Sequence, residues 1–242
     1  MKLVATVLVF LLGVVSVMST SGLSDDEKTE VLNAHNYYRG LVDPVASNMQ
    51  RMYWDEELGY MAQFWAAGCI YEINENRHTQ STKFDYVGEN KLALSGYSAN
   101  YTLLVNRWFK IGQSYDHYTG YCRDEDGNQE QCEDEMDCIC APYVQLVWAQ
   151  TYAVGCGVSR CTELEGAEDD GENALYFVCY YGPGGSIVSG EPPYDKGDVS
   201  CSSCPTDKPY CDRNLCSESG AERVVVHLSV ISVLMAAVLS IF

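Results

Sequence analysis

Twelve cysteines constrain this chain more than any other feature, and all of them lie between Cys69 and Cys216. An even number of cysteines in an exported chain favours disulfides over metal thiolates, because the secretory pathway is oxidising. We therefore expect the twelve cysteines to pair into six disulfides. The spacings Cys201-x-x-Cys204 and Cys211-x4-Cys216 also fit a four-thiolate zinc site, which is the alternative.

The N-terminus has the features of an export signal. Lys2 precedes an apolar run from Leu3 to Val17, and small residues follow up to Gly22. A charged start, an apolar centre and a small-residue end are typical of a signal peptide. We expect residues 1–21 to be removed near Ser21, so that the mature protein enters the secretory pathway.

A second apolar run lies at the other end of the sequence, from Val224 to Phe242. A spanning helix usually has basic residues on its cytoplasmic side, whereas Arg223 precedes this run. Ser219 begins a stretch of small residues suited to attachment of a glycosylphosphatidylinositol anchor, with Ser217 as a second candidate. We expect residues 218–242 to be an anchor signal that places the protein on the extracellular side of the plasma membrane. A single C-terminal transmembrane helix and simple secretion are the alternatives.

The chain is strongly acidic, with 34 Asp and Glu against 15 Lys and Arg and a formal net charge of -19 at pH 7. This charge repels phosphate backbones and anionic lipid surfaces, which excludes nucleic acid as a partner. Many acidic residues fall in segments 124–137 and 163–172, which we interpret as solvated insertions. Weak calcium binding is the alternative for these segments.

Hydrophobic periodicity predicts alternating helices and strands. Ser24 and Glu27 have the spacing of a capping box before a helix that runs to about Arg39. Apolar residues at three- and four-residue steps predict helices over 58–69 and 104–111. Short runs rich in β-branched or aromatic residues predict strands at 146–148, 154–158 and 174–181. Helices on both faces of a small antiparallel sheet would bury all these apolar side chains.

Several motifs follow one another in a characteristic order. They are His35-Asn36-x-x-Arg39, Trp65-Ala66-x-x-Cys69, Gly88-Glu89-Asn90, Tyr143 to Trp148, Gly155 to Cys161 and Phe177 to Gly185. Together they resemble the CAP superfamily of cysteine-rich secretory, antigen 5 and pathogenesis-related proteins. The resemblance implies an α+β fold, a three-layer α-β-α sandwich over residues 24–190. We expect Asn36 to bind buried backbone groups and Arg39 to pair with a carboxylate.

The segment after this domain resembles the cysteine-rich hinge of the glioma-pathogenesis-related branch of the family. The hinge would occupy residues 191–217, and Pro193 to Cys216 carries the resemblance. By resemblance, the hinge should contain the disulfides Cys201–Cys211 and Cys204–Cys216, with Cys161–Cys179 as a third disulfide in the domain.

Members of this family hold two histidines and two glutamates in a central cleft, a set suited to a divalent cation. By resemblance, His78 and Glu89 match the first histidine and the first glutamate. Ile111 and Pro142 stand where the second glutamate and the second histidine belong. Because neither offers a ligand atom, we expect a degenerate cleft with no metal and no cofactor, in which His78 and Glu89 form structural hydrogen bonds. His117 is an alternative source of the missing imidazole, because it follows the helix predicted over 104–111.

The sequence favours binding over catalysis. No serine has a motif around it and the cysteines are expected to be bridged, whereas nucleophilic hydrolysis needs Ser or Cys beside a base. We expect a non-enzymatic module, and the resemblance implies a lipid, a sterol or an extracellular protein as its ligand. The alternative is a metal-dependent hydrolase using His78, Glu89 and His117. Asn100 begins the one N-glycosylation sequon, which predicts an exposed glycan.

Treatment of expressing cells with phosphatidylinositol-specific phospholipase C tests the expected anchor at Ser219. The enzyme cleaves the lipid of such an anchor, so immunoblotting should find the protein in the medium after treatment. Protein that stays in the membrane fraction would favour the transmembrane helix instead.

Overall fold

The computed structural model describes residues 22–96, 99–124, 126–130, 138–167, 171–185 and 191–219. The expected signal peptide and residues 220–242 of the expected anchor segment lie outside this part of the chain. Ser219, the last described residue, is exposed. None of the helices in the described ranges has both the length and the apolar character needed to cross a bilayer.

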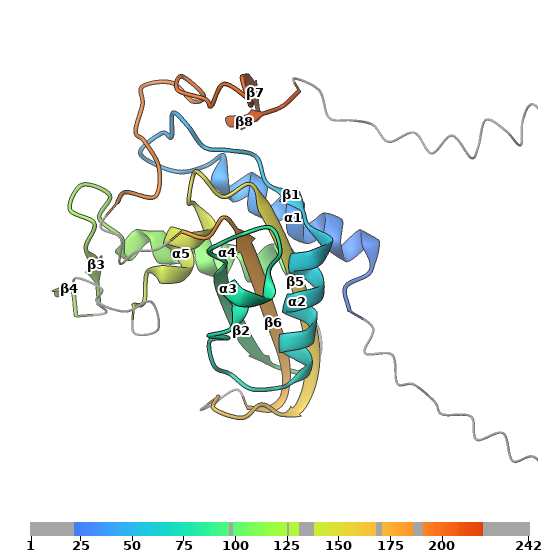
Figure 1. Cartoon of the computed structure of the whole chain (residues 1–242). Coiled ribbons are helices and arrows are strands. Elements are labelled where there is room, and N and C mark those ends of the chain that lie inside the picture. Colours follow the sequence, from blue (N-terminus) through green and yellow to red (C-terminus); the bar gives the residue numbers. More distant parts are fainter. Residues whose placement is uncertain are drawn as a thin grey trace, which may run out of the picture.

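A four-stranded sheet forms the centre of the molecule (Figure 1). Its strands lie in the order β1 (Tyr53–Trp54), β5 (Ala153–Glu163), β6 (Glu172–Gly182) and β2 (Gly88–Ser95). The pairs β5–β6 and β6–β2 are antiparallel, but β1 runs parallel to β5. The sheet is therefore mixed, and the expectation of a purely antiparallel sheet is wrong. A two-residue strand is too short for periodicity to predict it.

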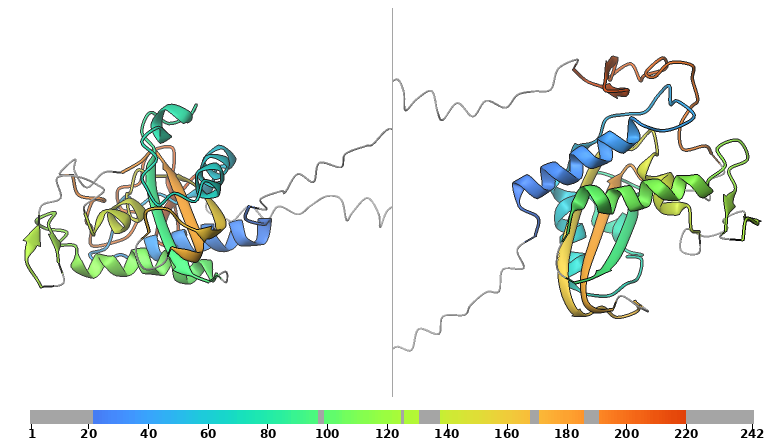
Figure 2. Two further views of the ribbon diagram at one scale, coloured as in Figure 1. Left: turned by 90° about the horizontal axis from the view of Figure 1, so that it is seen from below. Right: turned by 180° about the vertical axis from the view of Figure 1, so that it is seen from behind.

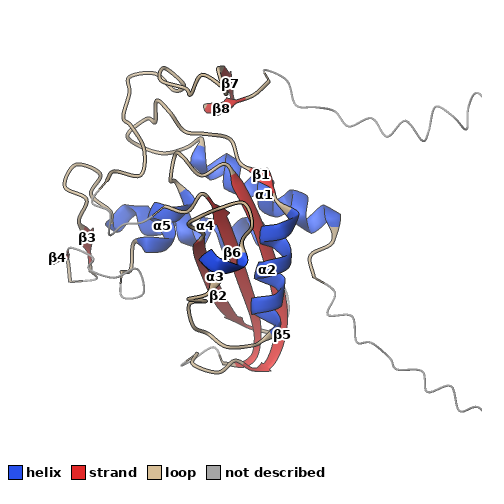
Figure 3. Cartoon of the chain, in the orientation of Figure 1, coloured by secondary structure: helices blue, strands red, loops and turns tan. Residues whose placement is uncertain are grey.

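Helices surround the sheet, and Figure 3 distinguishes them from the strands by colour. They are α1 (Asp25–Arg39), α2 (Glu56–Ala67), α3 (Arg77–Gln80), α4 (Tyr101–Lys110) and α5 (Ala141–Leu146), with a 3-10 turn η1 (Ile111–Ser114) after α4. Two short hairpins complete the described structure, β3 (Cys122–Arg123) with β4 (Gln129–Glu130) and β7 (Tyr210–Asp212) with β8 (Leu215–Ser217).

Both faces of β6 are buried, which explains the continuous apolar run in its sequence. Its odd-numbered side chains from Leu175 to Tyr181 join a core formed with α1, α4 and α5. Its even-numbered side chains from Ala174 to Tyr180 pack with α2 on the opposite face. Figure 2 shows α2 on one side of the strands and α1 with α4 on the other. This is the three-layer α-β-α arrangement that the resemblance implied.

The three helices predicted from periodicity are present, and polar side chains cap their first turns. Ser24 and Glu27 form the expected reciprocal capping box of α1. Asp55 accepts hydrogen bonds from main-chain N–H groups at the start of α2. Asn100 caps α4 through its Oδ1, which accepts from the N–H of Leu103 at 2.9 Å. Asn100 is exposed.

The strand expected at residues 146–148 is wrong. Leu146 is the last residue of α5, and Val147 and Trp148 lie in the turn that follows. A short apolar run fits a buried helical turn as well as a buried strand, so length and composition alone do not separate them. Pro142 sits in the first turn of α5, where proline is well tolerated.

The disulfides correct one expected pair. Cys156 and Cys179 are direct neighbours across β5 and β6, and they are bonded to each other. Cys161 lies opposite Ala174 in the same ladder and is bonded to Cys69, just after α2. The predicted Cys161–Cys179 disulfide is therefore wrong, because the strand register places Cys156, and not Cys161, beside Cys179.

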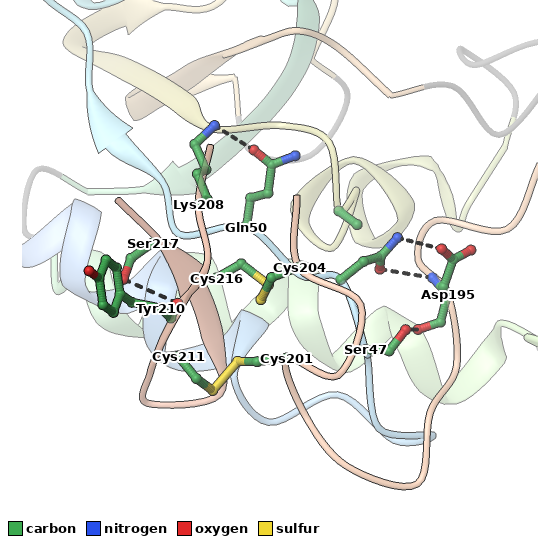
Figure 4. Close-up of a disulfide and its surroundings, with 12 residues drawn as sticks. Ser47, Gln50, Asp195, Cys201, Cys204, Lys208, Tyr210, Cys211, Cys216 and Ser217 are labelled. Carbon is green, nitrogen blue, oxygen red and sulfur yellow. Dashed lines mark hydrogen bonds between the residues drawn. A yellow bond between two sulfur atoms is a disulfide. The ribbon is translucent and has the colours of Figure 1, made fainter. Parts of the chain in front are cut away.

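The hinge contains the two disulfides that the resemblance implied, Cys201–Cys211 and Cys204–Cys216 (Figure 4). Because all four sulfur atoms are in disulfides, the alternative of a four-thiolate zinc site is wrong.

Hydrogen bonds attach the hinge to the segment after α1. The buried Lys208 donates through Nζ to Gln50 Oε1 at 2.6 Å, as Figure 4 shows. The main-chain N–H of Cys216 donates to the carbonyl of Met49 at 2.7 Å. Residues of the hinge thus pack against the domain instead of extending away from it.

Arg39 is fully buried at the end of α1. Its guanidinium donates to carbonyl oxygens of two separate segments. One is the carbonyl of Gln50, and the others are those of Leu146, Trp148, Ala149 and Thr151. The expected carboxylate partner of Arg39 is therefore wrong, since main-chain carbonyls fill that role.

Asn36 binds buried backbone as expected, because it exchanges hydrogen bonds with the N–H and carbonyl of Met52.

We expect Arg39→Lys to lower the free energy of unfolding by about 3 kcal/mol, because an ammonium group cannot reach all of these carbonyls and leaves some buried without a donor. Urea denaturation followed by circular dichroism measures the loss. Arg107→Lys, at an exposed position of α4, is the matched control and should change stability by less than about 0.5 kcal/mol. Equal effects of the two substitutions would contradict the role assigned to Arg39.

Candidate binding cleft

A cleft of about 540 Å³ opens beside β2, the edge strand of the sheet. Four segments line it. The loop after α2 contributes Tyr71, Glu72 and Glu75, and strand β2 contributes residues 89–91. The chain at α5 contributes Pro142 and Gln145, and the segment after β6 contributes Gly185. This volume is within the range of ordinary ligand sites.

Two of the four positions that the resemblance singled out line this cleft. Glu89, on β2, accepts a hydrogen bond through Oε2 from the main-chain N–H of Asn74 at 3.0 Å. Pro142, in the first turn of α5, presents its carbonyl to Asn90 Nδ2 at 2.9 Å. The structure therefore brings together the glutamate and the proline of the expected set.

The other two positions do not line the cleft. His78, on α3, accepts a hydrogen bond at Nδ1 from the N–H of Val87 at 3.0 Å, and its ring stacks on Tyr86 at a centroid distance of 4.4 Å. Ile111, at the end of α4, packs against the half-cystines Cys122 and Cys140 and their neighbours. His78 has the structural hydrogen bond that we expected, and Ile111 is part of the apolar packing.

His117 lies elsewhere. Its ring contacts Tyr194 and Tyr115, with centroids 4.3 Å and 6.3 Å away. It borders two separate hollows that Tyr118 also lines, and it does not border the cleft along β2. Burial among these rings lowers the pKa of its imidazole. His117 therefore does not replace the imidazole that Pro142 lacks.

The residues present do not fit the divalent metal that the family resemblance implies. Ile111 and Pro142 offer no side-chain lone pair, and the Nδ1 lone pair of His78 is already used by an amide. In the described ranges, two groups of three residues bring possible metal-ligand atoms within 4.8 Å of one another. One group is His35, Cys156 and Cys179, and the other is Cys201, Cys204 and Cys216. The cysteines of both groups are in disulfides. The candidate residues therefore do not form a ligand set for a divalent metal.

Sequence reasoning missed two residues that shape the cleft, Asn90 and Gln145. Gln145 accepts the N–H of Gly185 through Oε1 at 2.8 Å and donates through Nε2 to Thr151. Its amide lies over Gly88, where a Cβ atom would overlap Oε1. Both residues lie within quoted family motifs, so the signal was present, but a motif does not say which of its members face a cavity.

A hydrogen-bonded series connects the buried core to the cleft. His35 donates through Nδ1 to the carbonyl of Val31 at 2.8 Å, and its Nε2 lies 2.9 Å from the hydroxyl of Tyr181. Asn90 Nδ2 donates to the same hydroxyl at 3.2 Å. Burial lowers the pKa of His35 from 6.5 to about 4, so its ring is neutral at physiological pH.

The charge of the cleft is dominated by acids. Glu72, Glu75 and Glu89 line it together with one basic residue, Lys91. Burial lowers the pKa of Lys91, while Glu89 and Glu72 act in the opposite direction. The Lys91 ammonium group lies 4.8 Å from the centroid of the Tyr71 ring and donates to the Tyr71 carbonyl at 3.4 Å.

The fold and the ordered motifs define a disulfide-containing α-β-α sandwich. A family model described as the cysteine-rich secretory protein family (CAP) matches residues 32–181. The chain belongs to this family.

Curated relatives include human GLIPR1-like protein 1, which is 36% identical over 191 residues, covering 76% of this chain and 69% of that protein. Mouse peptidase inhibitor 16 is 34% identical over 197 residues, covering 81% of this chain. The match spans only 35% of that longer protein. Likeness to the glioma-pathogenesis-related branch is therefore confirmed.

Among solved structures, the hookworm platelet inhibitor aligns with a TM-score of 0.59 and 21% sequence identity. The alignment covers 83% of this chain and 95% of the inhibitor. At this identity the likeness establishes the CAP fold alone.

Because the His35 ring is neutral in the folded protein, we predict that the free energy of unfolding depends on pH. Its pKa is about 4 when folded against 6.5 as the ordinary value, so below about pH 6.5 the unfolded chain binds a proton that the folded chain does not. The free energy of unfolding should therefore fall as the pH drops, by about 2 kcal/mol between pH 7 and pH 5. Urea denaturation at the two pH values measures this slope.

A His35→Gln variant is the control for this effect. It has no titratable ring at this position, so its stability should change by clearly less over the same interval, whatever its stability at pH 7. Identical slopes in the two proteins would show that another group titrates.

Proposed function

We propose that this chain is a non-enzymatic binding module of the CAP family, and that it recognises an extracellular protein partner through the cleft along β2. The observation that carries the proposal is the composition of that cleft. Its lining keeps Glu89 of the family's metal set but has a proline where an imidazole belongs, and its walls combine charged and amide side chains with apolar ones.

Turnover has no support from the arrangement of candidate groups. Hydrolysis needs a nucleophile beside a base, or a metal-bound water with an open coordination position. His78 is bonded to the backbone, His117 lies among tyrosines, and Glu89 binds the N–H of Asn74. The described residues thus assemble no set for the alternative hydrolase.

A protein partner suits the cleft better than a lipid or sterol. Glu72, Glu75 and Glu89 would repel the carboxylate of a fatty acid, and a sterol needs a mainly apolar cavity. Two of the curated relatives are named peptidase inhibitor 15 and peptidase inhibitor 16. An inhibitor acts by binding, which agrees with this proposal.

The proposed location is the extracellular side of the plasma membrane. The domain is rich in disulfides, as expected in an oxidising compartment. Asn100 uses its Oδ1 to cap α4, which leaves Nδ2 for a glycan at this exposed position. Ser219 is exposed after the hinge, at the proposed anchor site.

The test uses the full chain purified from expressing cells, together with a His78→Ala variant. We expect zinc far below one ion per chain by mass spectrometry, no extracted lipid, and no hydrolysis of ester or peptide substrates that differs between the two proteins. Stoichiometric zinc with turnover lost in His78→Ala would contradict the proposal. A lipid recovered in stoichiometric amount would replace the protein partner with a lipid ligand.

A further inference from the structure

Asn90 is a buried polar side chain of the cleft. It lines the cleft and is only 2% exposed. Both hydrogens of its amide nitrogen are used, by the Pro142 carbonyl at 2.9 Å and by the Tyr181 hydroxyl at 3.2 Å. Its Oδ1 is buried and accepts no hydrogen bond from the described residues. Such an oxygen is costly to bury unless a donor reaches it.

The orientation of this amide is fixed by the groups behind it. A carbonyl only accepts, so the Val31 carbonyl requires the His35 proton on Nδ1, which leaves the neutral Nε2 as an acceptor. Nε2 then accepts the hydroxyl proton of Tyr181, and the Tyr181 oxygen must accept from Asn90. A flipped amide would place Oδ1 against the Pro142 carbonyl, with two acceptors facing each other. Oδ1 is therefore held as an acceptor.

The overall charge of the cleft that Asn90 lines favours a cationic donor. Glu72, Glu75 and Glu89 line the cleft against one basic residue, Lys91, whose ammonium group is engaged with Tyr71. These three carboxylates form no group with ligand atoms all within 4.8 Å of one another. Carboxylates spaced apart suit an extended cation with several N–H groups better than a compact metal ion.

We propose that the cleft binds a basic side chain, a guanidinium or an ammonium group, of the partner protein, with Asn90 Oδ1 accepting one of its N–H groups and the acidic wall neutralising its charge. This inference rests on the proposed binding function and names the chemistry of its partner. The volume of about 540 Å³ accommodates one such side chain together with adjacent backbone.

The probe is N-acetyl-arginine-N-methylamide, titrated into the isotope-labelled full chain and followed by amide chemical shifts. We expect saturable shifts at Asn90, including its side-chain amide, and at Gly185. The matched probe has citrulline in place of arginine, which keeps the shape and removes the charge. It should bind roughly ten-fold more weakly, because charge-assisted hydrogen bonds are lost. N-acetyl-lysine-N-methylamide then tells an ammonium from a guanidinium preference.

Variants of the wall should change the affinity in opposite directions. Glu75→Gln should weaken arginine binding by about three-fold, since one exposed favourable charge is removed. Lys91→Met should strengthen it by a similar factor, because a like charge is removed. Asp26→Asn, at an exposed position of α1 outside the cleft, makes the same change in net charge as Glu75→Gln and should leave the affinity unchanged.

Equal binding of the arginine and citrulline probes, or no saturable shift at Asn90, would overturn the inference and leave water as the donor to Oδ1. Equal effects of Glu75→Gln and Asp26→Asn would also overturn it, because overall charge would then explain binding. These outcomes would still be compatible with binding of a neutral partner, and therefore with the proposed binding function. Only the zinc, lipid and turnover measurements above decide that function.

Discussion

The double burial of β6 is the constraint on which the other parts of this structure depend. Side chains from Ala174 to Tyr181 alternate between two cores, one under α2 and one under α1, α4 and α5. A strand buried on both faces needs helices on both sides, which makes the three-layer arrangement necessary. It also fixes the place of β2, which pairs with β6 through its whole length and so becomes the edge strand beside the cleft.

The far wall of the cleft depends on the same core through Arg39. Its guanidinium binds the carbonyls of Leu146 and Trp148 at the end of α5, while Gln50 on another segment accepts from the same group. This attachment holds α5 over the sheet, so that Pro142 and Gln145 face β2. Polar groups buried in the core thus determine the geometry of a surface site, and His35 extends that connection to Asn90 through Tyr181.

Much of the fold could be predicted from local pattern, and the errors have a common cause. The capping box at Ser24, the apolar steps of α2 and α4 and the long apolar run of β6 are signals carried by neighbouring residues. The run at residues 146–148 and the disulfide partner of Cys179 are not. Whether a short apolar run becomes helix or strand depends on what covers it, and a cysteine's partner depends on strand register, which local sequence does not specify.

The sequence by itself determined the family, the three longest helices, the hinge disulfides implied by the resemblance and the loss of metal ligands at Ile111 and Pro142, because residue identity is enough to state that a side chain has no lone pair. Only the tertiary structure decided that His78 and His117 lie away from the cleft and that Cys156 is the partner of Cys179. Only it placed Asn90 in the cleft with its oxygen fixed as an acceptor. The reason is that the polarity of a hydrogen-bonded series is set by groups far apart in the chain, which become neighbours only when the layers pack.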